Sequence, residues 1–197
     1  MELRRVVVTG LGALTPLGNT LQAYWEGLVN GISGAAPITN FDASKFKTRF
    51  ACEVKGFDPT QFMDRKEARK MDPFTQFAVA ASEEAMKDSG LVIESDEQKE
   101  RAGVVLGSGI GGMLVFQEEC INFGRGDGTP RFNPFFIPKM IADSCSGVIS
   151  MRHGLRGPSY VTMSACASAN NALIDSFNYI RMGTVDVMVS GGTEGSV

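Results

Sequence analysis

The chain has 197 residues and a formal net charge of −3, with 43% apolar and 21% charged residues. This composition is ordinary for a globular protein, and the charge excludes the broad basic surface that favours nucleic acid as a partner. Four separated cysteines and a single histidine make a zinc site or a disulfide framework unexpected. No apolar run reaches the length of a membrane span, and the run at residues 6–8 is too short for a signal peptide. We therefore expect a cytosolic protein with free thiols, no metal and no membrane contact.

The first half of the chain predicts one strand and two helices. Residues 4–8 are apolar and predict a buried strand, and residues 20–29 have the apolar spacing of a helix. Residues 30–60 are rich in Gly, Ser, Pro and Asp and predict irregular structure with short elements. Asp72-Pro73 is a favourable helix start, so a helix is expected from there to residue 89, before Gly90.

The second half predicts further strands that alternate with helices. Strands are expected at residues 102–106, 160–163 and 185–189, and helices at 113–123 and 139–151, with a loop at 124–138. Residues 164–166 are expected to turn the third of these strands into a helix that reaches about residue 182. Alternating apolar strands and helices indicate an α/β domain with a largely parallel sheet.

Cys166 lies where the strand at residues 160–163 turns into a helix, among small residues. Active sites of α/β proteins favour the carboxyl ends of strands. A helix N-terminus favours a thiolate, and its free N–H groups can hold an oxyanion during acyl transfer. Cys166 is therefore a candidate nucleophile. The alternative is a buried cysteine that fills space at a tight turn, which is the commoner case for a free cysteine.

Several separated motifs weigh against that alternative. They are residues 6–12 (VVVTGLG), 15–18 (TPLG), 65–67 (RKE), 69–72 (RKMD), 107–112 (GSGIGG), 134–138 (PFFIP), 154–159 (GLRGPS), 164–168 (SACAS) and 186–194 (DVMVSGGTE). In order and spacing, the sequence resembles the β-ketoacyl-[acyl carrier protein] synthases, above all the type II synthases of bacterial fatty-acid synthesis. The resemblance covers essentially the whole chain. It implies an acyltransferase with a thiolase-like fold, of which this α/β chain forms the first half of a five-layer αβαβα sandwich.

The resemblance also implies roles for single residues. Cys166 is the implied nucleophile that takes the acyl chain, with its own N–H as one oxyanion donor. Ile110 is the implied lining of the acyl pocket, and Phe136 the implied cap that crosses a homodimer interface to the partner's pocket. From spacing alone, core packing is favoured for both. His153 matches neither histidine motif of the family, so we expect a structural role for it.

A basic patch is the implied docking surface for acyl carrier protein. Lys66, Arg69 and Lys70 share one face if they are helical, and Arg131 adds to the patch. From the residues alone, such a pattern is more often a solvated face. Relatives often have two basic residues where this chain has Pro130-Arg131-Phe132, which departs from the pattern.

Family members are longer than this chain, and the two histidines that decarboxylate the malonyl unit belong to later motifs. We therefore expect residues 1–197 to form an incomplete N-terminal domain that does not condense on its own. The implied reaction needs no resident cofactor, since phosphopantetheine arrives on the carrier. A second polypeptide that carries the other half, a truncated gene and a small protein that only binds carrier or acyl groups remain open, as does a polyketide-type ketosynthase. The intact Cys166 favours an incomplete synthase.

Overall fold

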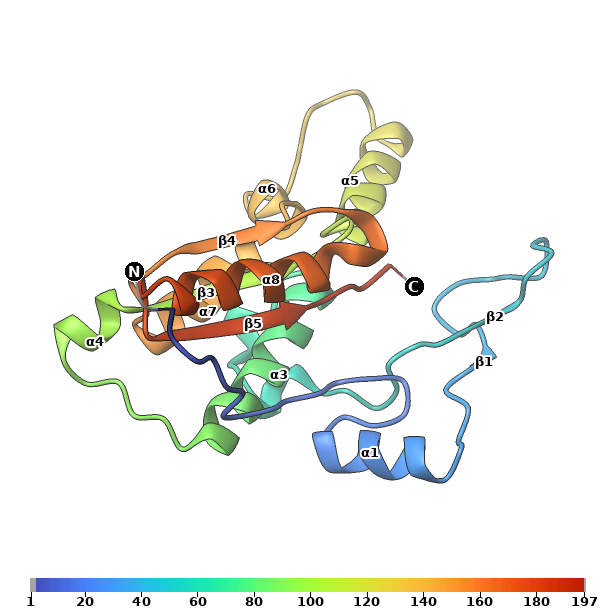
Figure 1. Ribbon diagram of the computed structural model, residues 1–197. Helices are drawn as coiled ribbons and strands as arrows, with labels where there is room; N and C mark the ends of the chain where they lie inside the picture. Colours follow the sequence, from blue (N-terminus) through green and yellow to red (C-terminus); the bar gives the residue numbers. More distant parts are fainter. Residues whose placement is uncertain (1–2, 197) are drawn as a thin grey trace.

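A parallel three-stranded sheet forms the centre of the computed structural model, which describes residues 3–196 (Figure 1). Its strands are β4 (Ser159–Thr162), β3 (Ala102–Gly107) and β5 (Val187–Gly192), in that spatial order. Val104 lies opposite Ser159 on one side and Val189 on the other. The expected α/β domain with a parallel sheet is confirmed.

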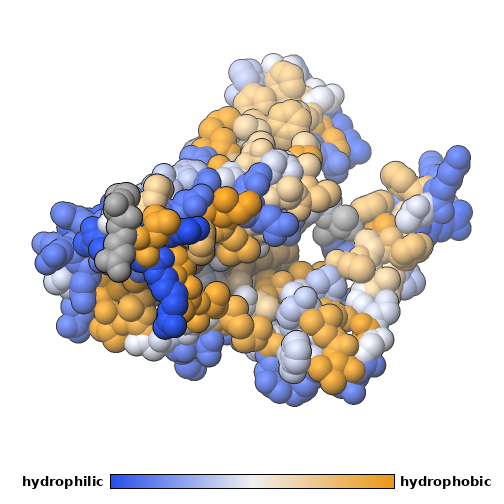
Figure 2. Space-filling model, in the orientation of Figure 1, coloured by the Kyte–Doolittle hydropathy of each residue, from blue (hydrophilic) through white to orange (hydrophobic). Residues whose placement is uncertain are grey.

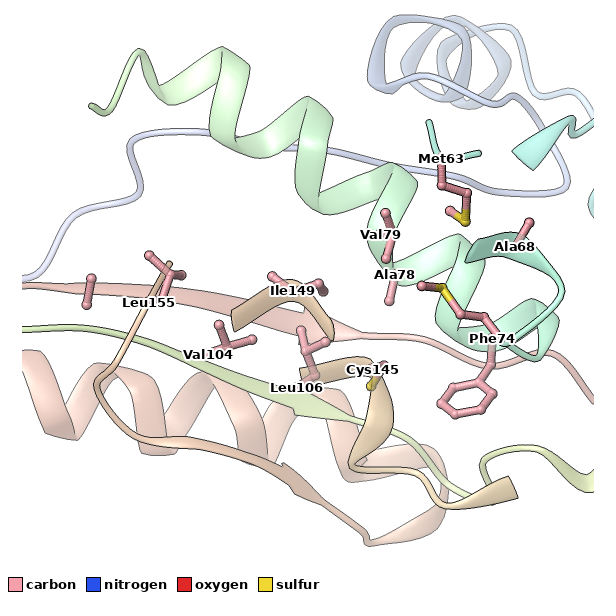
Figure 3. Close-up of a cluster of buried hydrophobic side chains, with 12 residues drawn as sticks. Met63, Ala68, Phe74, Ala78, Val79, Val104, Leu106, Cys145, Ile149 and Leu155 are labelled. Carbon is pink, nitrogen blue, oxygen red and sulfur yellow. The ribbon is translucent and has the colours of Figure 1, made fainter. Parts of the chain in front are cut away.

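Helices cover both faces of this sheet. Helix α8 (Ser168–Arg181) packs on one face, and α7 (Ser144–His153) with α3 (Pro73–Ser89) packs on the other (Figures 1 and 3). Every residue of β3 is buried, which explains its continuous apolar run. The main core lies between β3 and the α3–α7 pair and includes Phe74 and Ile149 (Figure 3).

Helix α3 begins and ends where its sequence signals predict. The Asp72 carboxylate accepts a hydrogen bond from the Phe74 N–H at 3.3 Å, and Pro73 occupies the first turn. Gly90 ends the helix with φ 62°, a left-handed conformation that suits glycine.

The remaining elements are shorter or lie outside the sheet. They are α1 (Leu21–Val29), β1 (Ala36–Pro37), β2 (Phe50–Ala51), the 3-10 turn η1 (Pro59–Gln61), α2 (Arg65–Ala68), α4 (Asp96–Glu100), α5 (Met113–Arg125), α6 (Phe136–Met140) and the 3-10 turn η2 (Ala165–Ala167). Strands β1 and β2 pair antiparallel in an arm that projects away from the sheet (Figure 1). The helix expected at residues 20–29 and the irregular stretch after it are confirmed.

The strand expected at residues 4–8 is wrong. This segment forms no ladder with any strand of residues 3–196, and Val8 is 78% exposed. The Arg4 N–H donates to the Arg181 carbonyl at 2.9 Å. The chain then passes along α3, where the Leu11 N–H donates to the Asp88 carboxylate and the Ala13 N–H to the Glu84 carboxylate. There a Cβ on Gly12 would lie 2.0 Å from the Ala81 carbonyl oxygen. An apolar run becomes a strand only when a neighbour supplies the ladder.

The single helix expected at residues 139–151 is also wrong, because it consists of two pieces. Helix α6 already begins at Phe136, inside the expected loop, and Ile141 follows it with ψ 133°, an extended conformation that ends the helix. Helix α7 then begins at Ser144. Near the C-terminus, the η2 turn precedes α8, in agreement with the turn expected at residues 164–166. Among residues 3–196, no helix combines the length and apolar character needed to cross a bilayer.

Candidate active site

Cys166 lies in the η2 turn, between the carboxyl end of β4 and the first residue of α8. Its side chain is exposed, whereas Cys145 is buried in the core. The alternative of a space-filling cysteine therefore applies to Cys145 and not to Cys166. A thiol at this place is accessible to a substrate and close to the positive end of the α8 dipole.

A cavity of about 550 Å³ opens at this turn. Its lining comes from the ends of β3, η2, α8 and β5: residues 107–110, Ala165, Cys166, Ser168, Ala169 and residues 192–194. Ile110 and Cys166 thus line the same space. Ile110 also lines a second, largely apolar cavity of about 510 Å³ with Met113, Phe116 and Met163. Ile110 thus lies between the cavity of Cys166 and a largely apolar cavity.

Glycines at the carboxyl ends of β3 and β5 bring α8 close to the sheet. A Cβ on Gly107 would lie 2.2 Å from the carbonyl carbon of Ser168, and one on Gly192 would lie 2.5 Å from the Ala169 Cβ. Real Cβ atoms do not approach so closely, so only glycine permits this contact. The contact places the N-terminus of α8 directly over the strand ends.

The turn that carries Cys166 is strained. Ala165 has φ 50°, and it is the one non-glycine residue with positive φ among residues 3–196. Ser168 bonds to both sides of it: the Ser164 N–H donates to Ser168 Oγ at 2.9 Å, and Ser168 Oγ donates to the Ala165 carbonyl at 2.7 Å. Asn171 Nδ2 donates to Ser164 Oγ at 2.6 Å. These bonds hold a conformation that alanine rarely adopts.

Glu194 lines the same cavity, and sequence reasoning did not single it out. Its carboxylate accepts a hydrogen bond from the Gly109 N–H at 2.7 Å and so fixes the loop that carries Ile110. Next to it, the Thr193 hydroxyl donates to the Phe74 carbonyl at 2.6 Å. A polar residue just after a parallel strand was the available signal.

The model of the protein family "Beta-ketoacyl synthase, N-terminal domain" matches residues 3–197. The chain belongs to the β-ketoacyl synthase family. It is 48% identical to "3-oxoacyl-[acyl-carrier-protein] synthase 2" of Synechocystis sp., over 100% of this chain and 47% of that protein. It is 40% identical to the protein of the same name from Staphylococcus aureus strain N315, over 98% of this chain and 46% of that protein. The chain therefore spans about half the length of these curated relatives.

Solved structures of ketosynthases share the fold. "The ishigamide ketosynthase/chain length factor" matches with a TM-score of 0.89 and 31% identity, over 98% of this chain and 48% of that one. A β-ketoacyl synthase from Burkholderia phymatum STM815 matches with a TM-score of 0.83 and 28% identity, over 100% of this chain and 48% of that one. The expected thiolase-like α/β fold is confirmed.

In this synthase domain, Phe136 belongs to an aromatic stack. Its ring stacks between Phe116, at 6.2 Å, and Phe132, at 5.8 Å between ring centroids. It lines neither the Cys166 cavity nor the second cavity that Ile110 shares. The aromatic stack fixes α6 against α5, so within this chain the contacts of Phe136 are packing contacts.

The basic residues of the synthase domain are exposed, and only part of the expected patch meets the condition of being helical. Helix α2 ends at Ala68, so Lys66 lies in it, Arg69 caps it and Lys70 follows in a turn. Lys70 Nζ instead lies 5.4 Å from the centre of the Phe135 ring.

Two further basic residues join this surface. Arg69 lines a shallow cavity of about 450 Å³ with Arg65 and Lys139, and Lys139 comes from α6. No sequence motif pointed to Lys139, because it lies about 70 residues after Arg69 in the chain. Arg131 lies 3.6 Å from Asp127 in an exposed ion pair.

His153 and Cys145 make contacts within the fold and do not line the cavity of Cys166. Burial lowers the pKa of His153, whose Nε2 lies 3.7 Å from the Glu83 carboxylate. Burial raises the pKa of the Cys145 thiol to about 12, and its Sγ donates to the Ala142 carbonyl at 3.1 Å. Within residues 3–196, no group of three His, Cys, Asp or Glu side chains is placed to hold a metal ion.

Proposed function

We propose that this chain is the N-terminal half of a 3-oxoacyl-[acyl carrier protein] synthase that elongates fatty acids. One observation carries the proposal: an exposed cysteine lies at the first turn of a helix, in a cavity that it shares with Ile110. The relatives at 40–48% identity support the fatty-acid pathway over a polyketide-type pathway, because each is a 3-oxoacyl-[acyl-carrier-protein] synthase 2.

In the first stage, Cys166 Sγ attacks the thioester carbonyl of an acyl carrier. The S–C bond of the enzyme forms, the bond to the carrier's phosphopantetheine sulfur breaks, and the carrier leaves with a free thiol. The Cys166 N–H and the N-terminus of α8 stabilise the oxyanion of the tetrahedral intermediate. Ile110 contacts the acyl chain, which extends into the apolar space beyond it.

In the second stage, malonyl carrier loses carbon dioxide and the resulting carbanion attacks the acyl-enzyme. The product is a β-ketoacyl carrier that is two carbons longer. The family's decarboxylating histidines match no residue of this chain, so we propose that residues 1–197 take the acyl group but do not condense. A second polypeptide or a longer parent chain supplies the other half. No resident cofactor is required.

Acyl carrier protein is the proposed partner, and the basic surface is its proposed docking site. Lys66, Arg69, Lys70 and Arg131 are exposed, and Lys139 extends this surface because it lines one shallow cavity together with Arg69. In the intact synthase, which we propose to be a cytosolic homodimer, Phe136 caps the acyl pocket of the partner subunit.

The proposal is tested by the thiol that the carrier releases. Acyl carrier is incubated with the protein, and free carrier thiol is measured with time. The wild type and Cys120→Ala, which removes another exposed cysteine, release one equivalent of carrier. Cys166→Ala releases none. Carrier that binds to the wild type without release of thiol contradicts the enzyme proposal and favours the protein that only binds carrier.

A further inference from the structure

The strained turn at Ala165 controls more than the position of the Cys166 sulfur. The left-handed conformation of a non-glycine residue persists only where surrounding bonds hold it. At this turn the bonds converge on one side chain, Ser168, which is buried.

Ser168 differs from an ordinary helical serine. Ser82 shows the ordinary pattern, in which a buried hydroxyl donates to the carbonyl three residues before it, here Val79 at 2.9 Å. Ser168 makes that same bond to the Ala165 carbonyl but also accepts from the Ser164 N–H. It therefore joins the backbone on both sides of the strained residue.

The bond to the Ala165 carbonyl has a consequence for the next residue. No cis peptide bond occurs in residues 3–196, so the link from Ala165 to Cys166 is trans. In a trans peptide, the carbonyl and the following N–H point in opposite directions. When Ser168 Oγ fixes the Ala165 carbonyl, it also fixes the direction of the Cys166 N–H.

We propose that Ser168 is a positioning residue that aims the Cys166 N–H at the oxyanion formed during acyl transfer. Asn171 supports it, because its amide holds the Ser164 hydroxyl on the opposite side of the turn. The inference rests on the proposed function, since it names the residue that sets the oxyanion donor of the same site. Ser168 does not touch the reacting atoms and acts through the backbone.

Two reactions of the same thiol separate this role from general support of the fold. With p-nitrophenyl acetate, Sγ bonds to the acetyl carbon through a tetrahedral oxyanion, p-nitrophenolate leaves, and the thiol proton passes to solvent. With iodoacetamide, Sγ displaces iodide and no oxyanion forms. Only the first reaction uses the Cys166 N–H, and neither needs acyl carrier.

The experiment measures both rates at each cysteine of the 197-residue chain by mass spectrometry of peptides. We expect Ser168→Ala to slow acetylation of Cys166 by about tenfold or more, since one oxyanion donor is worth that much or more. We expect its alkylation to change by less than about threefold, because that reaction forms no oxyanion for the Cys166 N–H to stabilise. Ser176→Ala is the matched control, because Ser176 is buried on the same helix and its hydroxyl has no partner among residues 3–196.

Cys145 reports folding in the same samples, because it is fully buried and becomes alkylated only if the core opens. If Ser168→Ala exposes Cys145, Asn171→Ala replaces it, with Asn170→Ala as its control. A loss of acetylation of about threefold with unchanged alkylation then supports the proposal. Equal loss of both reactions, or no loss of acetylation, overturns it.

A wild-type Cys166 that is acetylated no faster than the exposed Cys52 and Cys120 also overturns the inference, because no oxyanion donor then acts. A different result would contradict the proposed function alone. In that result, Cys166 is acetylated by p-nitrophenyl acetate as expected but takes no acyl group from acyl carrier.

Discussion

At the scale of single residues, Asp186 joins three distant parts of the chain. It precedes β5, and its carboxylate lies 2.6 Å from Arg4 of the N-terminal segment and 2.5 Å from Arg101 before β3. Hydrogen bonds from Arg101, and then from Arg4, lower the pKa of Asp186 to about 2. Without a strand at residues 4–8, this carboxylate helps to fix the N-terminal segment to the sheet.

Asp186→Asn is expected to lower the free energy of unfolding at pH 7 by about 1 kcal/mol, a small value because the pair is half exposed. The folded pKa lies below the ordinary value, so the stabilisation is present above about pH 4 and is lost as the pH falls towards 2. Urea unfolding at pH 7 and pH 3 measures it. Asp96→Asn, which breaks a more exposed pair with Arg156, is the control and should change little. An equal effect of both variants at pH 7 contradicts the account.

At the scale of elements, the sequence predicted the helix ends that depend on interactions between neighbouring residues. The Asp72-Pro73 start and Gly90 end of α3 were readable because both act within one turn. The capping box formed by Ser95 and Gln98 at the start of α4 is a local signal of the same kind, although no helix was predicted at residues 96–100. Residues 4–8 failed because a strand depends on a neighbour that the sequence pattern does not name. The break at Ile141 also depends on tertiary packing.

The close contact between β3 and α8 gives a sharp test at this scale. Gly107→Ala is expected to destabilise the protein by about 2–3 kcal/mol, because the new methyl group meets the backbone of Ser168. Gly147→Ala, in α7, is the control: nothing lies within 4 Å of its added Cβ, so it should stabilise by up to about 1 kcal/mol. Thermal unfolding of both variants measures the difference. Similar effects of the two changes contradict the proposed packing.

At the scale of the whole molecule, the chain exposes more surface than a folded monomer of its size. Its accessible surface is 12093 Å², against about 9,000 Å² expected for its mass. Figure 2 shows apolar side chains over α8 and over the separate α1. On α8 these include Leu173, Ile174 and Phe177. In the proposed intact synthase, the second half and the partner subunit are available to cover such faces.

The sequence predicted some residues of the candidate site and not others. The sequence placed Cys166 and Ile110 at strand ends, and the cavity brings them together because parallel strands end at one edge. No role was predicted for Ser168, Glu194 or Lys139, because their roles depend on hydrogen bonds and on contacts between distant segments. The proposed role of Phe136 as a cap involves a second subunit, and within this chain its ring packs on Phe116 and Phe132.

Carrier docking is expected to depend on the charge of the basic surface. The double change Lys66→Glu and Arg69→Glu should weaken binding of acyl carrier by about tenfold or more at low salt, and less at high salt. Lys45→Glu with Lys47→Glu, exposed on the projecting arm, makes the same charge change away from α2. Titration calorimetry at two salt concentrations compares them. Equal weakening by both pairs means that net charge alone acts and contradicts a docking site at α2.

The central claim is that Cys166 accepts the acyl group, and the mass of the protein tests it most directly. The protein is incubated with acyl carrier, and its intact mass and peptides are measured under denaturing conditions. The account predicts an increase by one acyl group, located on Cys166 and absent from Cys166→Ala. An acyl group on another cysteine, an increase that persists in Cys166→Ala, or no increase at all would contradict it.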